Sequence, residues 1–120
     1  MNRPSHFEFH SNDPAKALAF FEKVFGWKTQ KWDGPQEYWL LMTGTGNGID
    51  GGLMKSMDGN PRTVNTIEVQ NVDEALAKCT ANGAQVAVPK MAIPGVGWLA
   101  YCIEPTGNLF GVMHHDHGAK

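Results

Sequence analysis

The chain carries one pattern of structure twice, and this repeat constrains its fold more than any other feature. A stretch of alternating polar and apolar residues passes into a helix at residues 12–18, and the same change recurs at residues 71–76. A Thr-Gly-Asn turn followed by a glycine-containing strand also occurs in both halves, at residues 45–54 and 106–113. Several landmarks in the same order indicate an internal duplication.

Each half is predicted to contain one strand, one helix and three further strands. Residues 6–10 and 66–70 alternate between polar and apolar side chains, which is the period of a strand with one buried face. The other strands are expected at residues 27–32, 38–43 and 51–55 in the first half and at residues 85–89, 98–103 and 109–114 in the second. The order of elements is therefore βαβββ twice, with a linker at residues 58–62.

The first helix has clear start and stop signals. Pro14 suits the first helical position, where its missing N–H costs nothing, and Gly26 suits a left-handed cap at the end. Leu18, Phe21 and Phe25 recur at a helical spacing, so they are predicted to face the core.

The composition is typical of a soluble globular protein. With 120 residues, 42% hydrophobic and 18% charged, the chain suits a single domain with modules at about residues 5–56 and 63–114. The net charge of −2 and the lack of a lysine or arginine run argue against a nucleic-acid partner. No apolar segment approaches the ~20 residues that span a bilayer, so no membrane association is expected.

The cysteines and the first residues indicate a reducing compartment. Cys79 and Cys102 lie in a predicted helix and a predicted strand, where two buried thiols are favoured over a disulfide. The chain leads straight into alternation without the apolar segment of a signal peptide. We therefore expect a cytoplasmic protein.

The order of elements predicts an α+β architecture with a cleft. Each helix covers one face of its own four-stranded sheet, which leaves the other face in need of a partner. The two tandem βαβββ modules are therefore expected to form a curved mixed sheet around a shared cleft. Alternation places His6, Glu8, Thr66 and Glu68 on the polar faces that line it.

Three stretches of the sequence carry a resemblance to a known family. They are residues 6–14 together with residues 20–27 (FFEKVFGW), residues 48–54 (ending in GGLM), and residues 93–111 (IPGVG, then EPTGNLFG). Together they resemble the glyoxalase/bleomycin resistance protein/dioxygenase superfamily, also called the vicinal oxygen chelate (VOC) superfamily, from His6 to His114. The resemblance implies the fold of that superfamily, whose members catalyse different reactions or only bind ligands.

Enzymes of this superfamily generally bind a divalent metal through the first and last strands of their modules, and the resemblance places those positions on this chain. His6 occupies the first ligand position, and its counterpart falls at or next to Val64, which cannot ligate. The last-strand positions fall near Gly52 and Gly111, where glutamates would be wanted. One ligand of four remains, so neither a metal nor another cofactor is expected. Glycine at these positions indicates either room for a ligand or a tight crossing of the modules.

A pair of carboxylates offers a competing site. Glu8 and Glu68 are interpreted as holding matching places in the two modules, so they could face one another. Such a pair could serve acid–base catalysis or, with His6, hold a cation.

Histidines and aromatic residues offer further candidates. Trp98 follows the flexible residues 94–97 and is predicted to form a wall of the cleft, where a planar ligand would lie. The dense His-His-Asp-His segment at residues 114–117 is expected to fray, so it is interpreted as a fortuitous weak metal chelator rather than as a designed metal site. His10 is expected to be solvated or to cap the strand.

These observations favour a glyoxalase-like protein that binds a small organic molecule in its cleft without the usual divalent metal. The predicted ligand contacts are His6, Glu8, Thr66, Glu68, Trp98, Gly52 and Gly111. The alternative is a metal-dependent lyase, isomerase or dioxygenase with a non-standard site at His6, Glu8 and Glu68. A partner-binding or regulatory module is a third hypothesis. A homodimer is expected from the resemblance and because two-fold pairing is the commonest assembly.

Overall fold

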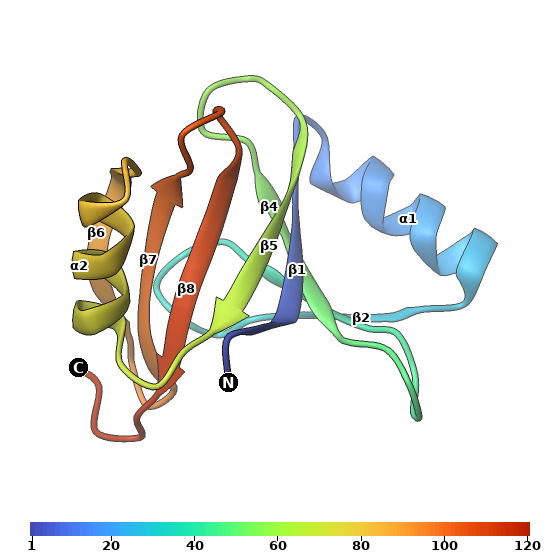
Figure 1. Cartoon of the computed structure of the whole chain (residues 1–120). Coiled ribbons are helices and arrows are strands. Elements are labelled where there is room, and N and C mark those ends of the chain that lie inside the picture. The colour runs from blue at the N-terminus through green and yellow to red at the C-terminus, as the bar shows by residue number, and fades with distance from the viewer. The chain divides into compact units, whose positions relative to one another are not determined.

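Helices and strands follow one another in the predicted order in the computed structural model, which describes residues 1–120 (Figure 1). They are β1 (Arg3–Ser11), α1 (Pro14–Phe25), β2 (Lys28–Lys31), β3 (Trp39–Met42), β4 (Gly51–Lys55), β5 (Arg62–Glu68), α2 (Val72–Ala81), β6 (Gln85–Ile93), β7 (Gly97–Ile103) and β8 (Leu109–His115). The predicted α+β class and the βαβββ order of both halves are confirmed. Neither helix is long and apolar enough to cross a membrane.

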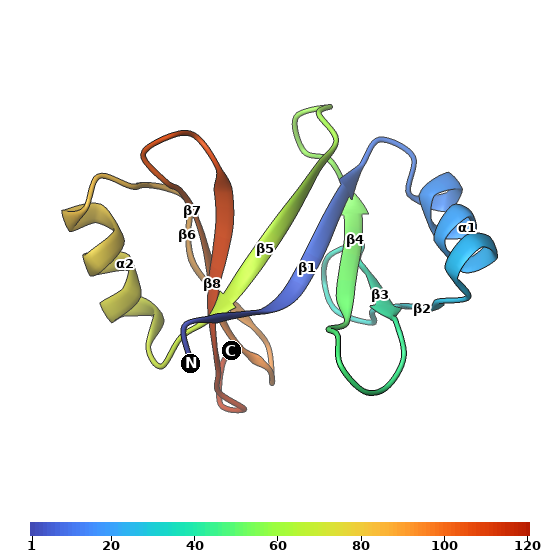
Figure 2. The same ribbon diagram turned by 45° about the vertical axis from the view of Figure 1, so that its right-hand side comes forward.

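The chain divides into two units. The N-terminal unit comprises His6–Val64, and the C-terminal unit comprises Met1–Ser5 together with Asn65–Lys120. Each unit contains one helix beside its strands, as Figure 2 shows for α1 and α2.

In the N-terminal unit the strand order is β2-β3-β4-β1. Strand β3 is antiparallel to β2 and β4, whereas β1 is parallel to β4, with Glu8 opposite Gly52. Helix α1 lies along one side of these strands (Figure 1) and packs Leu18 against Leu41 and Leu53, which are fully buried. The helix therefore covers the apolar side of β1 and leaves its polar side for other contacts.

The C-terminal unit repeats this scheme. Its strand order is β5-β8-β7-β6, with β5 parallel to β8 and the other pairs antiparallel. Helix α2 packs against β6, β7 and β8. The buried core consists of Val69, Val72, Ala100 and Val112. The duplication seen in the sequence thus appears as a duplicated pairing of strands.

Helix α1 begins and ends where the sequence predicts. Asp13 is the N-cap, its carboxylate accepts the Lys16 amide at 3.2 Å, and Pro14 opens the helix. Gly26 ends the helix at φ 71°, a left-handed conformation that costs glycine little, and its N–H donates to the Glu22 carbonyl.

The prediction that Phe25 faces the core is wrong, because its side chain lies at the surface and the residue is 61% exposed. Phe25 is in the last turn of α1, where the chain turns away through Gly26 into β2. Its ring lies against Phe21 and Trp27, with centroid distances of 6.3 and 5.8 Å. Phe21 itself stacks on Phe9 at 4.8 Å, so the apolar stripe is covered at its start and exposed at its end.

Three strands extend by more than one residue beyond a predicted end. Strand β1 begins at Arg3. The sequence does not predict this early start, because the first residues of the strand are all exposed and show no alternation. Strand β5 begins at Arg62, inside the predicted linker. Strand β6 continues to Ile93, past shifts in its register with β7. The sequence does not predict this extension, because an irregularity of this kind breaks the alternation that marks a strand.

The two cysteines are free thiols, as predicted. Cys102 is fully buried, whereas Cys79 is half-buried. Burial raises the pKa of the Cys102 thiol to about 11, so it stays protonated and unreactive at neutral pH.

We predict that Leu41→Ala destabilises the protein far more than Phe25→Ala. Truncation of the fully buried Leu41 should lower the free energy of unfolding by about 2–5 kcal/mol, whereas the exposed Phe25 should contribute about 1 kcal/mol or less. Urea unfolding followed by tryptophan fluorescence measures both losses. Equal losses in the two variants would place Phe25 in the core after all.

Candidate functional site

The polar side of β1 is the best-defined candidate site. His6, Glu8 and His10 alternate along the strand with Phe7 and Phe9, which pack on the helical side. Glu8 and His10 are 3% and 8% exposed, and His6 is half-buried. A buried carboxylate needs hydrogen-bond donors in place of water, and neighbouring side chains supply them.

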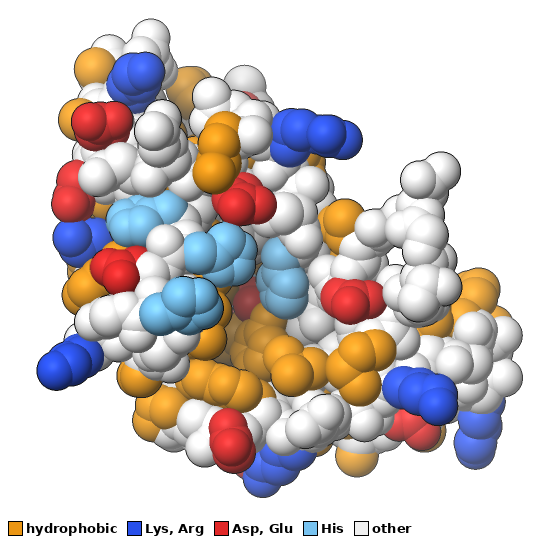
Figure 3. Space-filling model, turned by 90° about the horizontal axis from the view of Figure 1, so that it is seen from below, with side chains coloured by type: hydrophobic (Ala, Val, Ile, Leu, Met, Phe, Trp, Pro, Cys, Tyr) orange, Lys and Arg blue, Asp and Glu red, His pale blue; other side chains and the backbone are white.

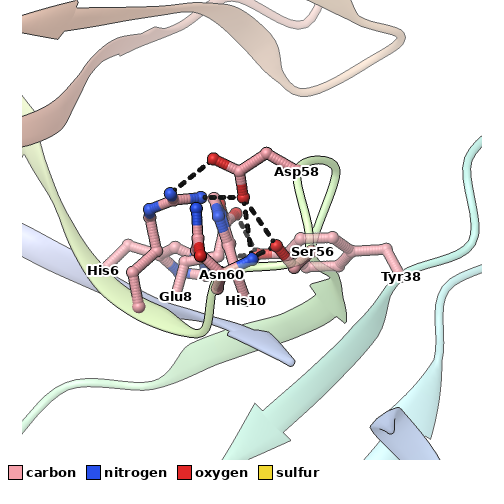
Figure 4. A network of polar contacts seen from close by, with 8 residues as sticks. His6, Glu8, His10, Tyr38, Ser56, Asp58 and Asn60 are labelled. Atoms are coloured by element: carbon pink, nitrogen blue, oxygen red, sulfur yellow. Dashed lines mark hydrogen bonds and ion pairs between the residues drawn. The ribbon is translucent and has the colours of Figure 1, made fainter. Parts of the chain in front are cut away.

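Four side chains form a hydrogen-bonded chain that we call the β1 network: His6, Tyr38, Glu8 and His10 (Figure 4). The Tyr38 hydroxyl donates to Glu8 Oε2 at 2.8 Å, and His10 Nε2 lies 2.7 Å from Glu8 Oε1. His6 Nε2 lies 2.9 Å from the Tyr38 hydroxyl oxygen. Because the Tyr38 proton points to Glu8, the proton between His6 and Tyr38 belongs to His6 Nε2. The other ring nitrogen of His6, Nδ1, is then an acceptor.

The His6 imidazole is neutral at neutral pH. Burial lowers its pKa below the ordinary 6.5, and this effect outweighs the carboxylates of Glu8 and Asp50, which raise it. No buried side-chain nitrogen or oxygen lacks a hydrogen-bond partner, so Nδ1 of His6 is accessible to solvent. His6 therefore offers a neutral acceptor to a ligand.

Tyr38 fills the space beside Gly52. A Cβ atom on Gly52 would overlap the hydroxyl oxygen and Cζ of Tyr38, so no side chain fits there while the ring stays in place. The sequence suggests either room for a ligand or a crossing of the modules as the reason for this glycine. The structure shows a different reason, because a ring of the same unit occupies the space.

Gly111 has an analogous but looser surrounding in the C-terminal unit. A Cβ atom there would lie 3.0 Å from Thr66 Oγ1 and 3.5 Å from Leu99 Cδ1. Thr66 is 2% exposed and lies opposite Gly111 in the pairing of β5 with β8, just as Glu8 lies opposite Gly52.

The strand register corrects the predicted equivalence of Glu8 and Glu68. Since the glycines of the last strands correspond, the counterpart of Glu8 in the repeat is Thr66, and the same offset relates the N-caps of the two helices. Glu68 therefore corresponds to His10. The symmetry argument for a facing pair of carboxylates is lost, and Glu68 lies instead 3.7 Å from His115 Nε2 within the C-terminal unit.

Trp98 is held by contacts within the C-terminal unit. Its indole N–H donates to Asp116 Oδ2 at 3.0 Å, and the Lys90 ammonium lies 4.8 Å from the ring centre. The ring is half-buried and packs against the core of the unit. That Trp98 forms a wall of the cleft stays a prediction.

The C-terminal tail is bound to the rest of its unit, contrary to the prediction that it frays. His114 Nδ1 accepts the Val72 amide at 2.9 Å and so satisfies the first amide of helix α2. The Ala119 carbonyl accepts from Gly95, and Ala119 is 3% exposed. Histidine side chains do reach the surface, as Figure 3 shows in pale blue. No group of three or more His, Cys, Asp or Glu side chains is placed to hold a metal ion.

A groove of about 360 Å³ opens at the exit end of β1, within the N-terminal unit. Its walls come from helix α1, the end of β1 and the start of β5; they are formed by Phe9, His10, Ser11, Ala17, Phe21, Pro61, Arg62 and Thr63. The guanidinium of Arg62 is already held by Asp58 through hydrogen bonds of 3.0 and 2.7 Å, so the groove presents no unpaired charge. We therefore place the candidate site at the other end of the network, around His6.

Two residues of the network have roles that the sequence analysis does not predict. The expectation that His10 is solvated is wrong, since it is buried and bonded to Glu8. The alternation of β1 could have identified it, because it places His10 on the same face as Glu8. Tyr38 lies just before β3, and no sequence pattern indicates that its ring reaches Gly52.

Comparison with known proteins gives a family match. The model of the Glyoxalase/Bleomycin resistance protein/Dioxygenase superfamily matches residues 3–112. The proteins named "Putative glyoxylase CFP32" of Mycobacterium bovis and Mycobacterium tuberculosis are 31% identical to this chain over 109 residues. The match covers 88% of this chain and 41% of each relative, so the chain spans less than half the length of these curated relatives.

Solved structures of low sequence identity share the fold. Methylmalonyl-CoA epimerase from Mycobacterium tuberculosis has a TM-score of 0.70 at 15% identity, covering 95% of this chain and 88% of that one. The hypothetical protein BH1468 from Bacillus halodurans C-125 has a TM-score of 0.71 at 15% identity, covering 98% and 97% of the two chains. The predicted fold is thereby confirmed.

The residues at the expected metal positions do not fit a divalent metal. His6 uses Nε2 to bond Tyr38, Val64 is apolar and fully buried, and the Tyr38 ring fills the place of a side chain at Gly52. Gly111 has no side chain to offer. A divalent metal needs several deprotonated donor atoms, and of these four positions only His6, through Nδ1, offers one.

We predict that Gly52→Ala lowers the free energy of unfolding by about 1–3 kcal/mol, because the new Cβ atom displaces the Tyr38 ring from Glu8. Gly111→Ala is the matched control, since its Cβ atom meets only a tight contact with Thr66. In a Tyr38→Ala background the penalty at position 52 should fall to near zero. Urea unfolding of the single and double variants measures this coupling. An unchanged penalty in that background would contradict the contact.

We predict that the His6 imidazole titrates below pH 6.5 in the folded protein. Because folding lowers this pKa, the folded state binds fewer protons, and the contribution of neutral His6 to stability is present above pH 6.5. It is lost as the pH falls through the folded-state pKa. NMR titration of the imidazole measures the midpoint, and His6→Gln should remove this part of the acid sensitivity while His117→Gln should not. A midpoint above 6.5 would show that the carboxylates outweigh burial.

Proposed function

This chain belongs to the glyoxalase/bleomycin resistance protein/dioxygenase superfamily, and we propose that it binds a small organic molecule at the β1 network without a resident divalent metal. The observation that carries the proposal is the position of the Tyr38 hydroxyl. It fills the space beside Gly52, where a metal-binding side chain would stand, and it bonds the one family ligand that remains, His6. A hydrogen-bonded site thus stands in place of a coordination site.

The hydrogen bonds of the β1 network hold its side chains in fixed orientations, which suits the binding of a ligand. Glu8 accepts from Tyr38 on one oxygen and contacts His10 on the other, and Tyr38 in turn bonds His6. Bonds of this kind, in a part-buried chain, polarise one another and fix the orientation of each ring. The end of the network that faces solvent is His6 Nδ1, so the ligand should donate a hydrogen bond to this atom.

The relatives limit what can be carried over to this chain. Several solved structures that share the fold are methylmalonyl-CoA epimerases, and one of them is a complex with methylmalonyl-CoA. At 13–15% identity this likeness extends to the fold and not to the ligand. A homodimer and a cytoplasmic location are part of the proposal and rest on the family and on the composition.

A metal-dependent lyase, isomerase or dioxygenase around His6, Glu8 and Glu68 is the competing function. Two carboxylates and an imidazole are residue types that commonly bind a divalent metal. However, Glu8 already contacts two side chains, and Glu68 corresponds to His10 rather than to Glu8 in the repeat. The metal-free hypothesis is therefore favoured.

The proposal predicts ligand binding at His6 without metal binding. Calorimetric titration of the untagged protein with Ni²⁺, Zn²⁺, Mn²⁺ and Fe²⁺ should give no stoichiometric submicromolar binding that His6→Ala abolishes. An NMR screen of small organic compounds should find ligands that shift the His6 resonances. These ligands should bind at least tenfold more weakly to His6→Ala and to Tyr38→Phe, and unchanged to His117→Ala.

Two results would contradict the proposal. Submicromolar metal binding that is lost in His6→Ala would support the metal-dependent enzyme. Ligands that bind equally well to His6→Ala and to the unchanged protein would place the binding site away from the β1 network.

A further inference from the structure

We propose that Cys79 and Cys102 form a reversible disulfide that ties helix α2 to strand β7, with a low-molecular-weight disulfide as the oxidant. Both residues belong to the C-terminal unit, so the inference is independent of the ligand site proposed in the N-terminal unit. Three observations carry it: both side chains point into one interface, the two thiols are in contact, and only one of them is open to solvent.

Both side chains point into the contact between α2 and the sheet. On β7, Ala100 packs in the core of the unit, and Cys102 follows two residues later on the same face of the strand. On α2, Ala75 and Leu76 pack against the same core, and Cys79 lies one turn further along that face of the helix. The helix and the strand therefore direct both sulfur atoms into one interface.

The two residues also lie at the same end of the unit. Cys79 is in the last turn of α2, and its carbonyl accepts the amide of Ala84, where the chain turns towards β6. Val86, near the start of β6, pairs with Cys102. The thiol of Cys102 accordingly forms a side-chain hydrogen bond with Cys79. From such a contact, small side-chain rotations bring two sulfur atoms to the about 2.0 Å of a disulfide bond.

Exposure decides which thiol reacts first. Cys79 is half-buried, so a small oxidant can reach it, whereas Cys102 is fully buried. Burial and the neighbouring Cys79 raise the pKa of the Cys102 thiol to about 11, so Cys102 does not react with an external oxidant by itself. Cys79 is therefore the attacking residue, and Cys102 resolves the mixed disulfide that Cys79 forms.

The reaction consists of two thiol–disulfide exchanges. The Cys79 thiolate attacks one sulfur of the oxidant, which forms a mixed disulfide and releases one thiolate. Cys102 then gives up its proton, and its sulfur attacks Sγ of Cys79, which releases a second thiolate. The two released thiolates take up the two protons of the cysteines. The cysteines are thereby oxidised to one disulfide, the oxidant is reduced to two thiols, and an excess of thiol reverses both steps.

The disulfide would fix the last turn of α2 on β7. Transient disulfides of this kind serve as redox responses in reducing compartments, so the inference agrees with two free thiols in the resting protein. Because a fixed turn opens less often, its amides exchange with solvent more slowly.

The test exposes the untagged full chain to mixtures of reduced and oxidised glutathione. We expect oxidation to lower the protein mass by two hydrogens, about 2 Da, and peptide mapping without reductant to find Cys79 joined to Cys102. Amide exchange in the last turn of α2 should slow by about tenfold or more in the oxidised protein. Dithiothreitol should reverse all three changes.

Single variants separate the two steps and serve as controls for each other. Cys102→Ala should trap a glutathione adduct on Cys79, whereas Cys79→Ser should leave the buried Cys102 unmodified. In the unchanged protein, conversion of the mixed disulfide to the internal one should accelerate about tenfold per pH unit at neutral to mildly alkaline pH, because Cys102 must first lose its proton.

Several results would overturn the inference. They are a folded protein that keeps two free thiols under an excess of oxidised glutathione, a glutathione adduct that persists on Cys79 beside an intact Cys102, and a disulfide between two chains in place of the internal one. A glutathione adduct on Cys102 in Cys79→Ser would overturn the order of the two steps.

Discussion

The buried carboxylate of Glu8 is the constraint on which the polar side of the N-terminal unit depends. At 3% exposure it has exchanged water for protein donors, and a carboxyl group in that position without donors would destabilise the fold by several kcal/mol. Tyr38 and His10 contact its two oxygens. The Tyr38 ring can reach Glu8 only because residue 52 is glycine, and the tautomer of His6 follows from the direction in which Tyr38 donates. The burial of one carboxylate thus accounts for the position of the Tyr38 ring, the glycine at position 52 and the hydrogen-bond acceptor on His6.

The fold could be predicted because it is encoded in short-range patterns. Alternation marks β1, Pro14 and Gly26 mark the ends of α1, and the repeat gives the order βαβββ. Patterns of this kind do not contain the register between strands. The equivalence of Glu8 with Thr66 emerges only when each is seen opposite a last-strand glycine.

The candidate site could be predicted in part. The face that carries His6, Glu8 and His10 follows from a two-residue period, whereas the assignment of Val64, Gly52 and Gly111 to metal positions rests on the family resemblance. The role of Tyr38 follows from neither, because it depends on the path of the loop that joins β2 to β3 and on the tertiary contact with Gly52. Similarly, Phe25 continues a helical stripe in sequence, but its side chain is exposed in the last turn of the helix, next to Gly26, where the chain leaves the helix.

The two units use one pairing scheme for different chemistry. Where the first strand of the N-terminal unit carries His6, Glu8 and His10, the corresponding positions of β5 carry Val64, Thr66 and Glu68. On the helical side Ile67 stands where Phe9 does, whereas the counterpart of the core residue Phe7 is the exposed Asn65. The copies have therefore diverged on both sides of the strand.

The overlap between a side chain at position 52 and the Tyr38 ring also limits the routes by which such a chain can evolve. A carboxylate introduced at position 52 alone meets the ring, so it must follow the loss of Tyr38. Loss of Tyr38 first takes a donor from the buried Glu8. Each order of the two substitutions therefore passes through a single variant that is less stable than the present protein. Replacement of Gly52 and Tyr38 by a metal-binding carboxylate and a smaller residue consequently requires a destabilised intermediate.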